Sequence, residues 1–324
     1  VLIGLISGYV AWMVKPSSVD PVRKYTISTG ARVNRAYNLP TISPDGRMVA
    51  FSKNGALWVR HLDELEATRI EGTDAGERPF WSPDSKSLGY FDLLASSMKV
   101  ISVSGRATSP VTVCQVVNVP RGAAWGSLDR IVFSTSSQGT FDFGSGLWEV
   151  SASGGTPRSV VQADTARGEI GIAYPHYLPD GVSLLYAVLY DDNGGAIASQ
   201  IDGHQNIIIK LDHAPLASPW YDPAGYIVYQ RGHRTAADLA PDPTSFAVWA
   251  VQVDRSSFVP IGDPFSVAIQ QQGPSVSSDG TLVFSSASDE VESGQMALLA
   301  RDGTVMRHIG KPQADLSNPD ISPD

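Results

Sequence analysis

The chain has 324 residues, and its 24 Lys and Arg against 33 Asp and Glu give a formal net charge of −9. This acidic balance argues against a nucleic-acid-binding surface, because phosphate contacts need clustered Lys and Arg side chains. The 30 glycines and 22 prolines are many for a helical protein and are typical of short strands joined by tight turns. The single cysteine, Cys114, excludes an internal disulfide, and its apolar neighbours predict that it is buried.

The first 14 residues form an uncharged, apolar run that ends at Lys15-Pro16. A spanning helix needs about 20 apolar residues, so we interpret residues 1–14 as the C-terminal part of a transmembrane helix. Residues 15–35 then form a juxtamembrane linker with one strand, Tyr25-Thr-Ile-Ser28. The Lys and Arg residues after the span would lie in the cytoplasm by the positive-inside rule. The other flank is absent, so charge alone leaves the orientation open.

A short turn motif recurs along the rest of the chain, most clearly as Ser43-Pro-Asp-Gly46. Proline presets the φ angle of a type I turn, Asp bonds to nearby backbone N–H groups, and Gly accepts the positive φ that closes a hairpin. Seven copies, two of them degenerate, begin at residues 43, 82, 126, 178, 221, 277 and 322. The last copy stops at Asp324, so we expect the propeller to be truncated at its C-terminus. The spacing drifts around 45 residues, which indicates blades with variable loops and not a linear solenoid.

Each turn is followed by alternating apolar segments that predict three further strands. The expected fourth strands are Ala67–Ile70, Pro110–Val113, Arg158–Val161, Asn206–Lys210, Phe258–Ile261 and Val305–His308. The unit therefore has four antiparallel strands, and its repetition predicts an all-β propeller of about six blades over residues 36–324. A β-sandwich also contains many strands, but it would not repeat one turn and one strand order six times.

Six tryptophans occupy repeated positions in these units. Three lie on third strands and three lie just before the turn on first strands. The two sets are Trp58, Trp148 and Trp249, and Trp81, Trp125 and Trp220. Periodic placement of this kind predicts packing between blades more than a platform for a ligand.

The Ser-Pro-Asp-Gly turns and the Leu-Trp-Val strands of residues 36–324 resemble the TolB-like, WD-repeat-like propeller units of bacteria. Two stretches, Leu57–Ser85 and Ala166–Gly181, are similar to the extracytoplasmic half of membrane-bound bacterial serine/threonine protein kinases. This resemblance implies a cytoplasmic kinase domain, one transmembrane helix in the cytoplasmic membrane, and a propeller in the periplasm or outside the cell. Similar propellers also accompany winged-helix regulators and prolyl-oligopeptidase-type peptidases.

The sequence carries no catalytic motif of these families. The His-Arg-Asp and Asp-Phe-Gly kinase motifs and the Gly-x-Ser-x-Gly nucleophile elbow are missing from it, and no two histidines have the helical zinc spacing. We therefore predict that this chain is not itself an enzyme and uses no cofactor and no metal.

A binding site is expected where loops lead into the first strands, because these loops ring the mouth of the central channel. The expected site residues are Glu77, Arg78, Arg121, Arg167, Glu169, His176 and Gln272. They would hold a protein, a peptide or a small-molecule ligand. The alternative is that they only cap strands and contact solvent at the rim.

The leading functional hypothesis is a non-catalytic, membrane-tethered propeller that serves as the sensory or scaffolding ectodomain of a receptor kinase. Two alternatives stay open. One is a TolB-like protein-interaction scaffold, and the other is the accessory propeller of a peptidase or of a winged-helix regulator.

Overall fold

The computed structural model describes residues 39–104, 109–136, 144–192, 194–232 and 246–286, and the backbone of residues 294–299 and 305–313. By its internal contacts the chain divides into Val1–Ala31 and Arg32–Asp324, and every described residue belongs to the second unit. The predicted transmembrane segment 1–14 and the linker 15–35 lie outside the described residues. Within the described part, no helix is long and apolar enough to cross a membrane.

Five sheets of four antiparallel strands make up most of the structure. In chain order, the first two sheets are β1 (Thr41–Ile42), β2 (Met48–Lys53), β3 (Ala56–His61) and β4 (Thr68–Arg69), then β5 (Gly76–Trp81), β6 (Ser87–Asp92), β7 (Ser97–Ser102) and β8 (Val111–Gln115). The third and fourth are β9 (Pro120–Trp125), β10 (Arg130–Thr135), β11 (Gly146–Ser151) and β12 (Arg158–Gln162), then β13 (Glu169–Tyr177), β14 (Leu184–Tyr190), β15 (Gly195–Ile201) and β16 (His204–Leu211). The fifth is β17 (Leu216–Asp222), β18 (Tyr226–Gly232), β19 (Phe246–Gln252) and β20 (Phe265–Ile269), and a 3₁₀ turn η1 (Thr165–Arg167) precedes β13.

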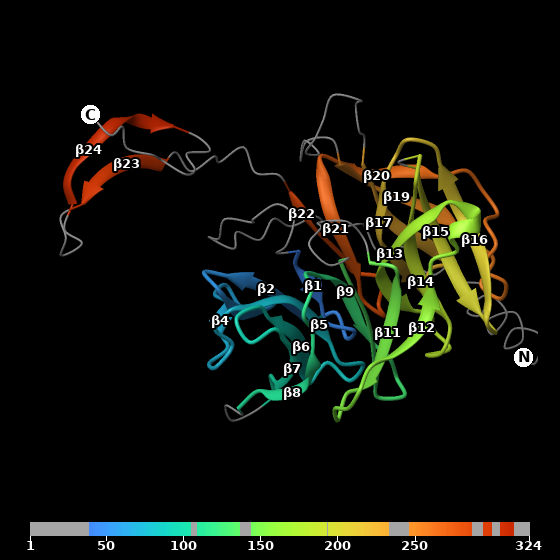
Figure 1. Cartoon of the computed structure of the whole chain (residues 1–324), viewed down its shortest axis with the longest axis horizontal. Helices are drawn as coiled ribbons and strands as arrows, with labels where there is room; N and C mark the ends of the chain where they lie inside the picture. The colour runs from blue at the N-terminus through green and yellow to red at the C-terminus, as the bar shows by residue number, and fades with distance from the viewer. Residues whose placement is uncertain are drawn as a thin grey trace, which may run out of the picture. The chain divides into compact units, whose positions relative to one another are not determined.

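A sixth position is occupied by a two-stranded sheet, β21 (Gln271–Val276) and β22 (Leu282–Ser286). The first strand of each sheet contacts the first strand of the next, from β1 through β5, β9, β13 and β17 to β21, and β21 contacts β1 again. Figure 1 shows these strands nearest the centre and the last strand of each four-stranded sheet farthest out. The described sheets therefore form a closed ring, which is the arrangement of a β-propeller.

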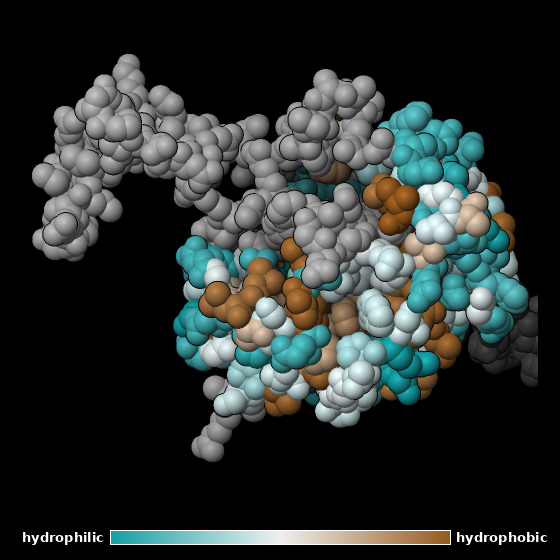
Figure 2. Space-filling view, viewed as in Figure 1, coloured by the Kyte–Doolittle hydropathy of each residue, from teal (hydrophilic) through white to brown (hydrophobic). Residues whose placement is uncertain are grey.

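Hydrophobic clusters fill the spaces between neighbouring sheets of the ring. Leu57 of β3 and Leu88 of β6, for example, belong to the cluster between the first two sheets. The cluster that joins the last sheet to the first contains Phe51 of β2 and packs against Val283 of β22. Because residues on both faces of the second strands β2, β6, β10, β14 and β18 are buried in this way, the core lies between the blades. In the view of Figure 2, hydrophilic and hydrophobic residues are interspersed over the visible surface of these blades.

The repeated turns share one backbone hydrogen bond between the first and fourth residues, and the copies that begin with serine add the same side-chain bonds. In the first copy, Ser43 Oγ donates to Asp45 Oδ1 (2.5 Å), Gly46 N donates to Ser43 O (2.9 Å), and Met48 N donates to Ser43 Oγ (2.9 Å). Neighbouring turns also touch, because Asp45 N donates to Ser85 Oγ at 3.1 Å. The motif therefore fixes each hairpin and also links adjacent blades at one end of the channel.

Several predictions from the sequence are confirmed and others need correction. Cys114 is buried, and burial raises the pKa of its thiol to about 11. Where about six four-stranded blades were expected, the structure has five, and the sixth sheet has two strands. The segments expected to complete the sixth blade form a separate antiparallel pair, β23 (Gly294–Leu299) and β24 (Val305–Gln313).

The predicted fourth strand at Phe258–Ile261 is wrong, and the fourth strand of the fifth sheet is β20. Asp254 explains the difference, because its carboxylate accepts the backbone N–H groups of Ser256 (3.0 Å) and Ser257 (2.9 Å) and holds a turn there. Pro260, within the predicted strand, has no N–H to donate to a ladder, and it makes only an isolated bridge to Val253.

Candidate functional site

The channel inside the ring contains a cavity of about 550 Å³. Its lining comes from all of the first strands and from the turns that follow them, so every sheet of the ring contributes to one wall. Ligand sites typically have volumes of about 300–1,000 Å³ and a mostly apolar lining. The cavity has both properties, and we treat it as the candidate functional site.

A bulge at the same point of the first strands shapes this wall. In five sheets the register of the first strand against the second shifts at a corresponding place, and β13 has a further shift near its start. A residue with positive φ lies at each shift: Arg78 (51°), Gly122 (107°), Tyr174 (54°), Ser218 (48°) and Gly273 (60°). Four of these residues are followed by proline. A bulge with a left-handed residue re-aims the side chains that follow it, and the cavity lining begins at this point of each strand.

Glycine is required at the last of these bulges for a second reason. A Cβ atom built on Gly273 would lie 2.4 Å from Leu39 Cδ2. The approach brings the chain just before β1 against β21. A larger residue at this position would therefore require the Leu39 side chain to move.

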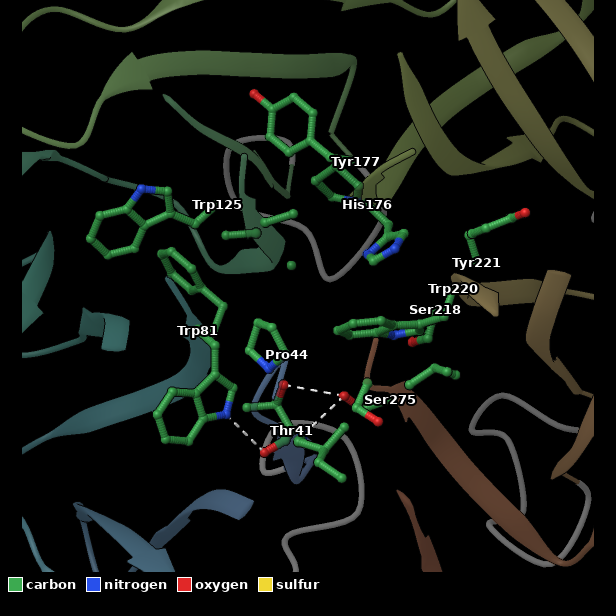
Figure 3. Close-up of a pocket in the computed structure, with 18 of the residues that line it drawn as sticks. Thr41, Pro44, Trp81, Trp125, His176, Tyr177, Ser218, Trp220, Tyr221 and Ser275 are labelled. Carbon is green, nitrogen blue, oxygen red and sulfur yellow. Dashed lines mark hydrogen bonds between the residues drawn. The ribbon is translucent and has the colours of Figure 1, made fainter. Parts of the chain in front are cut away.

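Aromatic side chains cover the wall on the side of β13 and β17. The His176 imidazole packs on the Trp220 indole with 4.4 Å between ring centroids and 43° between ring planes, as Figure 3 shows. Both side chains are half-buried. Burial lowers the pKa of His176 from 6.5 to about 4, because an apolar environment disfavours the imidazolium form. The ring is therefore neutral at physiological pH.

The opposite side of the channel carries a small hydroxyl network. Thr41 Oγ1 lies 3.2 Å from Ser275 Oγ, and Ile42 N donates to Ser275 Oγ at 3.1 Å. The Trp81 indole N–H donates to Thr41 O at 3.1 Å, so this side chain is tied to the same corner (Figure 3). These bonds connect β1, β5 and β21. They hold the first and last sheets of the ring together.

Charge is scarce along the lining. Among the described lining residues, Arg78 is the one charged side chain at neutral pH, and no Asp, Glu or Lys is present. Tyr177 OH lies at 3.4 Å from Glu149 Oε1, and burial together with this carboxylate raises the pKa of Tyr177. Trp125 Nε1 donates to Asp129 at 3.1 Å. These donors are thus turned to partners that lie outside the cavity.

Two of the predicted site residues, Arg78 and His176, line the cavity. Glu77 and Arg121 come just before the bulges of their strands and lie outside the lining. Glu77 is half-buried, and burial raises its pKa against the opposing effect of Arg78. Arg121 is 7% exposed, and its Nε and Nη2 atoms have no hydrogen-bond partner.

The other predicted residues also lie outside the cavity lining. Arg167 pairs with Asp164, with 3.2 Å between Nε and Oδ2, on the exposed η1 turn. Glu169 is buried, and its Oε2 accepts Asp164 N at 2.9 Å. Gln272 is buried in β21 opposite Ser285. The structure thus brings Arg78 and His176 to one cavity. The other predicted site residues lie outside it, at or near the starts of first strands.

Tryptophans that were predicted to be core residues contribute to the site. Trp81, Trp125 and Trp220 line the cavity, although Trp81 is also buried between the first two sheets. Trp148 is 39% exposed on β11, which corrects the prediction that it packs between blades. The sequence carries a signal for the lining that was missed, because two prolines four positions apart bracket it in Pro40–Pro44, Pro79–Pro83, Pro175–Pro179 and Pro219–Pro223.

Comparison with solved structures places the chain among known propellers. TolB from Agrobacterium tumefaciens matches with a TM-score of 0.55 and 16% identity over 76% of this chain and 88% of that one. TolB from Acinetobacter baumannii matches with a TM-score of 0.50 and 16% identity over 66% of this chain and 51% of that one. The fold is a TolB-like β-propeller.

A nidogen/laminin complex is similar as well, with a TM-score of 0.54 and 13% identity over 85% of this chain and 94% of that one. At these identities the likeness concerns the fold alone. No family model and no curated protein matches the sequence. The function of the propeller must therefore be argued from its channel.

Proposed function

We propose that this propeller is a non-catalytic protein-interaction scaffold and that a segment of a partner protein enters its central channel. The observation that carries the proposal is the cavity of about 550 Å³, walled by all of the first strands and lined by aromatic rings and prolines. Recognition of an extended segment by aromatic and proline surfaces needs little ordering of the scaffold, because these side chains have few free torsions.

The similar structures support this reading at the level of fold. Two of them are TolB proteins, and a third is a complex between nidogen and laminin. An architecture that also occurs in a nidogen/laminin complex is compatible with protein–protein contacts. It does not name a partner, and the channel chemistry is the basis for choosing the binding site.

The channel can be tested with a matched pair of tryptophan variants. Random peptides displayed on phage are selected against the full chain and then measured against Trp220→Ala and Trp148→Ala. Trp220 lines the channel and stacks on His176, whereas Trp148 is exposed on an outer strand. We expect the selected peptides to lose at least about tenfold in affinity for Trp220→Ala, which is about 1.4 kcal/mol, and to bind Trp148→Ala as they bind the wild type.

Failure to select any peptide, or equal binding to both variants, would overturn the proposed function. Trp220→Phe keeps an aromatic ring and serves as a second variant if Trp220→Ala does not fold. Circular dichroism of each variant separates a loss of binding from a loss of structure.

The finer proposal is that the scaffold is anchored in the cytoplasmic membrane and belongs to a receptor kinase. It rests on the apolar run of residues 1–14 and on the sequence resemblance of residues 57–85 and 166–181. Fractionation of cells that express the chain with and without residues 1–14 tests the anchor. We expect the full chain in the membrane fraction and the shortened chain outside it, and recovery of both in the same fraction would contradict the anchor.

A further inference from the structure

The backbone of the first strands removes hydrogen-bond donors from the channel. In an antiparallel pair, successive residues alternate between bonding to the partner strand and facing away from it. Ser43 N bonds to Met48 O across the first hairpin, whereas Ile42 N turns away from β2 and donates to Ser275 Oγ. Pro40, two residues before Ile42, shares this outward orientation, and as a proline it has no N–H to present.

The same position is proline in most sheets of the ring. This position lies three residues before the first residue of each turn. It is occupied by Pro40, Pro79, Pro175, Pro219 and Pro274, and by Ala123 in the third sheet. Proline is tolerated in a strand where its missing N–H faces away from the ladder. Each of these residues keeps its carbonyl group. At these five positions the channel wall therefore offers a carbonyl acceptor without a backbone donor.

The nitrogen donors of several lining side chains already have partners, and lining hydroxyl groups such as those of Ser218 and Tyr221 can accept as well as donate. The indole N–H groups of Trp81 and Trp125 are bonded to Thr41 O and Asp129, and Tyr177 OH is directed to Glu149. Among the described residues, the ring nitrogens of His176 have no hydrogen-bond partner. A neutral imidazole offers one donor and one acceptor, so His176 does not change the balance.

The charge of the lining sets a second limit on the occupant. A carboxylate in the channel would need several donors, and an ammonium group would need an anionic partner, to offset the loss of their hydration. The described lining has no acidic side chain for a cation. Its one cationic side chain, Arg78, already takes part in another interaction, and its prolines present no backbone N–H to an anion. An uncharged group loses less hydration free energy than an ion when it enters the channel, and its hydrogen-bond donors can bond to the carbonyl acceptors.

We propose that the group that enters the channel is uncharged and carries hydrogen-bond donors on a planar or apolar body, as a primary amide or an indole does. The inference rests on the proposed function and specifies which part of a partner segment fits. Aromatic faces such as that of Trp220 would contact the body, and wall carbonyls such as that of Pro219 would accept its N–H groups.

Three small molecules of nearly one shape separate the possibilities. Benzamide is neutral with two N–H donors, benzoate is an anion without donors, and benzamidinium is a cation with donors. Their binding to the full chain at pH 7 is measured by ligand-observed NMR, with Trp220→Ala and Trp148→Ala as the test and control variants. We expect benzamide to bind at least about tenfold more tightly than either ion, which corresponds to about 1.4 kcal/mol. We also expect this binding to be lost in Trp220→Ala and kept in Trp148→Ala.

Tighter binding of benzoate or benzamidinium, binding of benzamide that survives Trp220→Ala, or no binding of any of the three would overturn the inference. The peptide selection distinguishes this failure from failure of the proposed function. Peptides that depend on Trp220 but are enriched in Lys, Arg, Asp or Glu would keep the scaffold and refute the uncharged occupant. The absence of Trp220-dependent peptides would refute the scaffold, whatever benzamide does.

Discussion

Ser275 Oγ lies 3.2 Å from Thr41 Oγ1, although the two residues are 234 positions apart in the chain. Ile42 N donates to the same Ser275 oxygen at 3.1 Å, and both hydroxyl groups are buried. This small network is the polar part of the junction between the last sheet and the first. It complements the apolar contact of Val283 with the cluster around Phe51.

Replacing Ser275 by alanine should weaken this junction. The substitution leaves the buried Ile42 N–H without its acceptor, and an unsatisfied buried donor costs about 1–3 kcal/mol. We expect a loss of that size in the free energy of unfolding, measured with urea. Ser266→Ala, on the exposed strand β20, is the control and should change the stability by less than about 0.5 kcal/mol. Equal stability of Ser275→Ala and the wild type would contradict the network.

The pKa of His176 depends on its packing against Trp220. Burial lowers this pKa to about 4 from 6.5, so the folded state disfavours the protonated ring. Its contribution to stability is therefore complete above about pH 6.5 and is lost as the pH falls from there toward 4. We expect the NMR titration of the His176 ring to move toward 6.5 in Trp220→Ala and to stay in place in Trp148→Ala. A wild-type midpoint near 6.5 would contradict the burial of this ring.

The turn carboxylates are expected to depend on their serine partners. Ser82 Oγ donates to Asp84 Oδ1 at 2.7 Å, and this bond, aided by the Lys86 N–H, lowers the pKa of Asp84. A lowered pKa stabilises the fold above the unfolded-state pKa, and the contribution is lost as the pH falls through the folded-state value.

We therefore expect Ser82→Ala to raise the pKa of Asp84, measured by carboxyl NMR. We also expect the variant to be less stable than the wild type at neutral pH, and this difference in the free energy of unfolding to become smaller in acid. Ser153→Ala is a control, because the Ser153 hydroxyl bonds to Ser151 and to no carboxylate. An unchanged pKa of Asp84 in Ser82→Ala would show that the hydroxyl does not stabilise the charged carboxylate.

Arg121 presents the opposite case of a polar group without partners. Its side chain is buried, and its Nε and Nη2 atoms make no hydrogen bond. Replacing a poorly paired buried charge by an apolar side chain of similar size is often neutral or stabilising by about 1–4 kcal/mol. We expect Arg121→Met to unfold at an equal or higher urea concentration than the wild type. A loss of more than about 1 kcal/mol would contradict this view of the side chain.

Local chemistry made the repeat predictable. The Ser43 and Ser82 turns form the same hydrogen bonds because Ser, Pro and Asp each supply one local requirement of the hairpin, and Gly46 or Ser85 takes the positive φ that closes it. The apolar strands after the turns follow the two-residue period that buries both faces between sheets. The ring of four-stranded sheets could therefore be predicted without knowledge of any long-range contact.

The site and the exceptions depend on information that is not local. Trp148 shares the third-strand position of Trp58 and Trp249, but Trp148 is exposed whereas the other two pack against core clusters, and the strand pattern does not distinguish them. The bulge at Tyr174 and Ser218 re-aims the residues after it, and a strict alternation misses this change. The displaced fourth strand, β20, depends on the turn around Asp254. The hydrogen bonds that the Asp254 carboxylate accepts fix this turn, although the apolar pattern of Phe258–Ile261 is typical of a strand.

Amide hydrogen exchange of Ile42 tests the closed ring most directly. The Ile42 N–H faces away from β2, so its protection depends on Ser275 of the last sheet. We predict slow exchange of Ile42 in the wild type and a large loss of protection in Ser275→Ala, while Ala50 in the adjacent β2 stays protected. Exchange of Ile42 at the rate of an unstructured peptide in the wild type would show that the first and last sheets do not meet and that the channel has no closed wall.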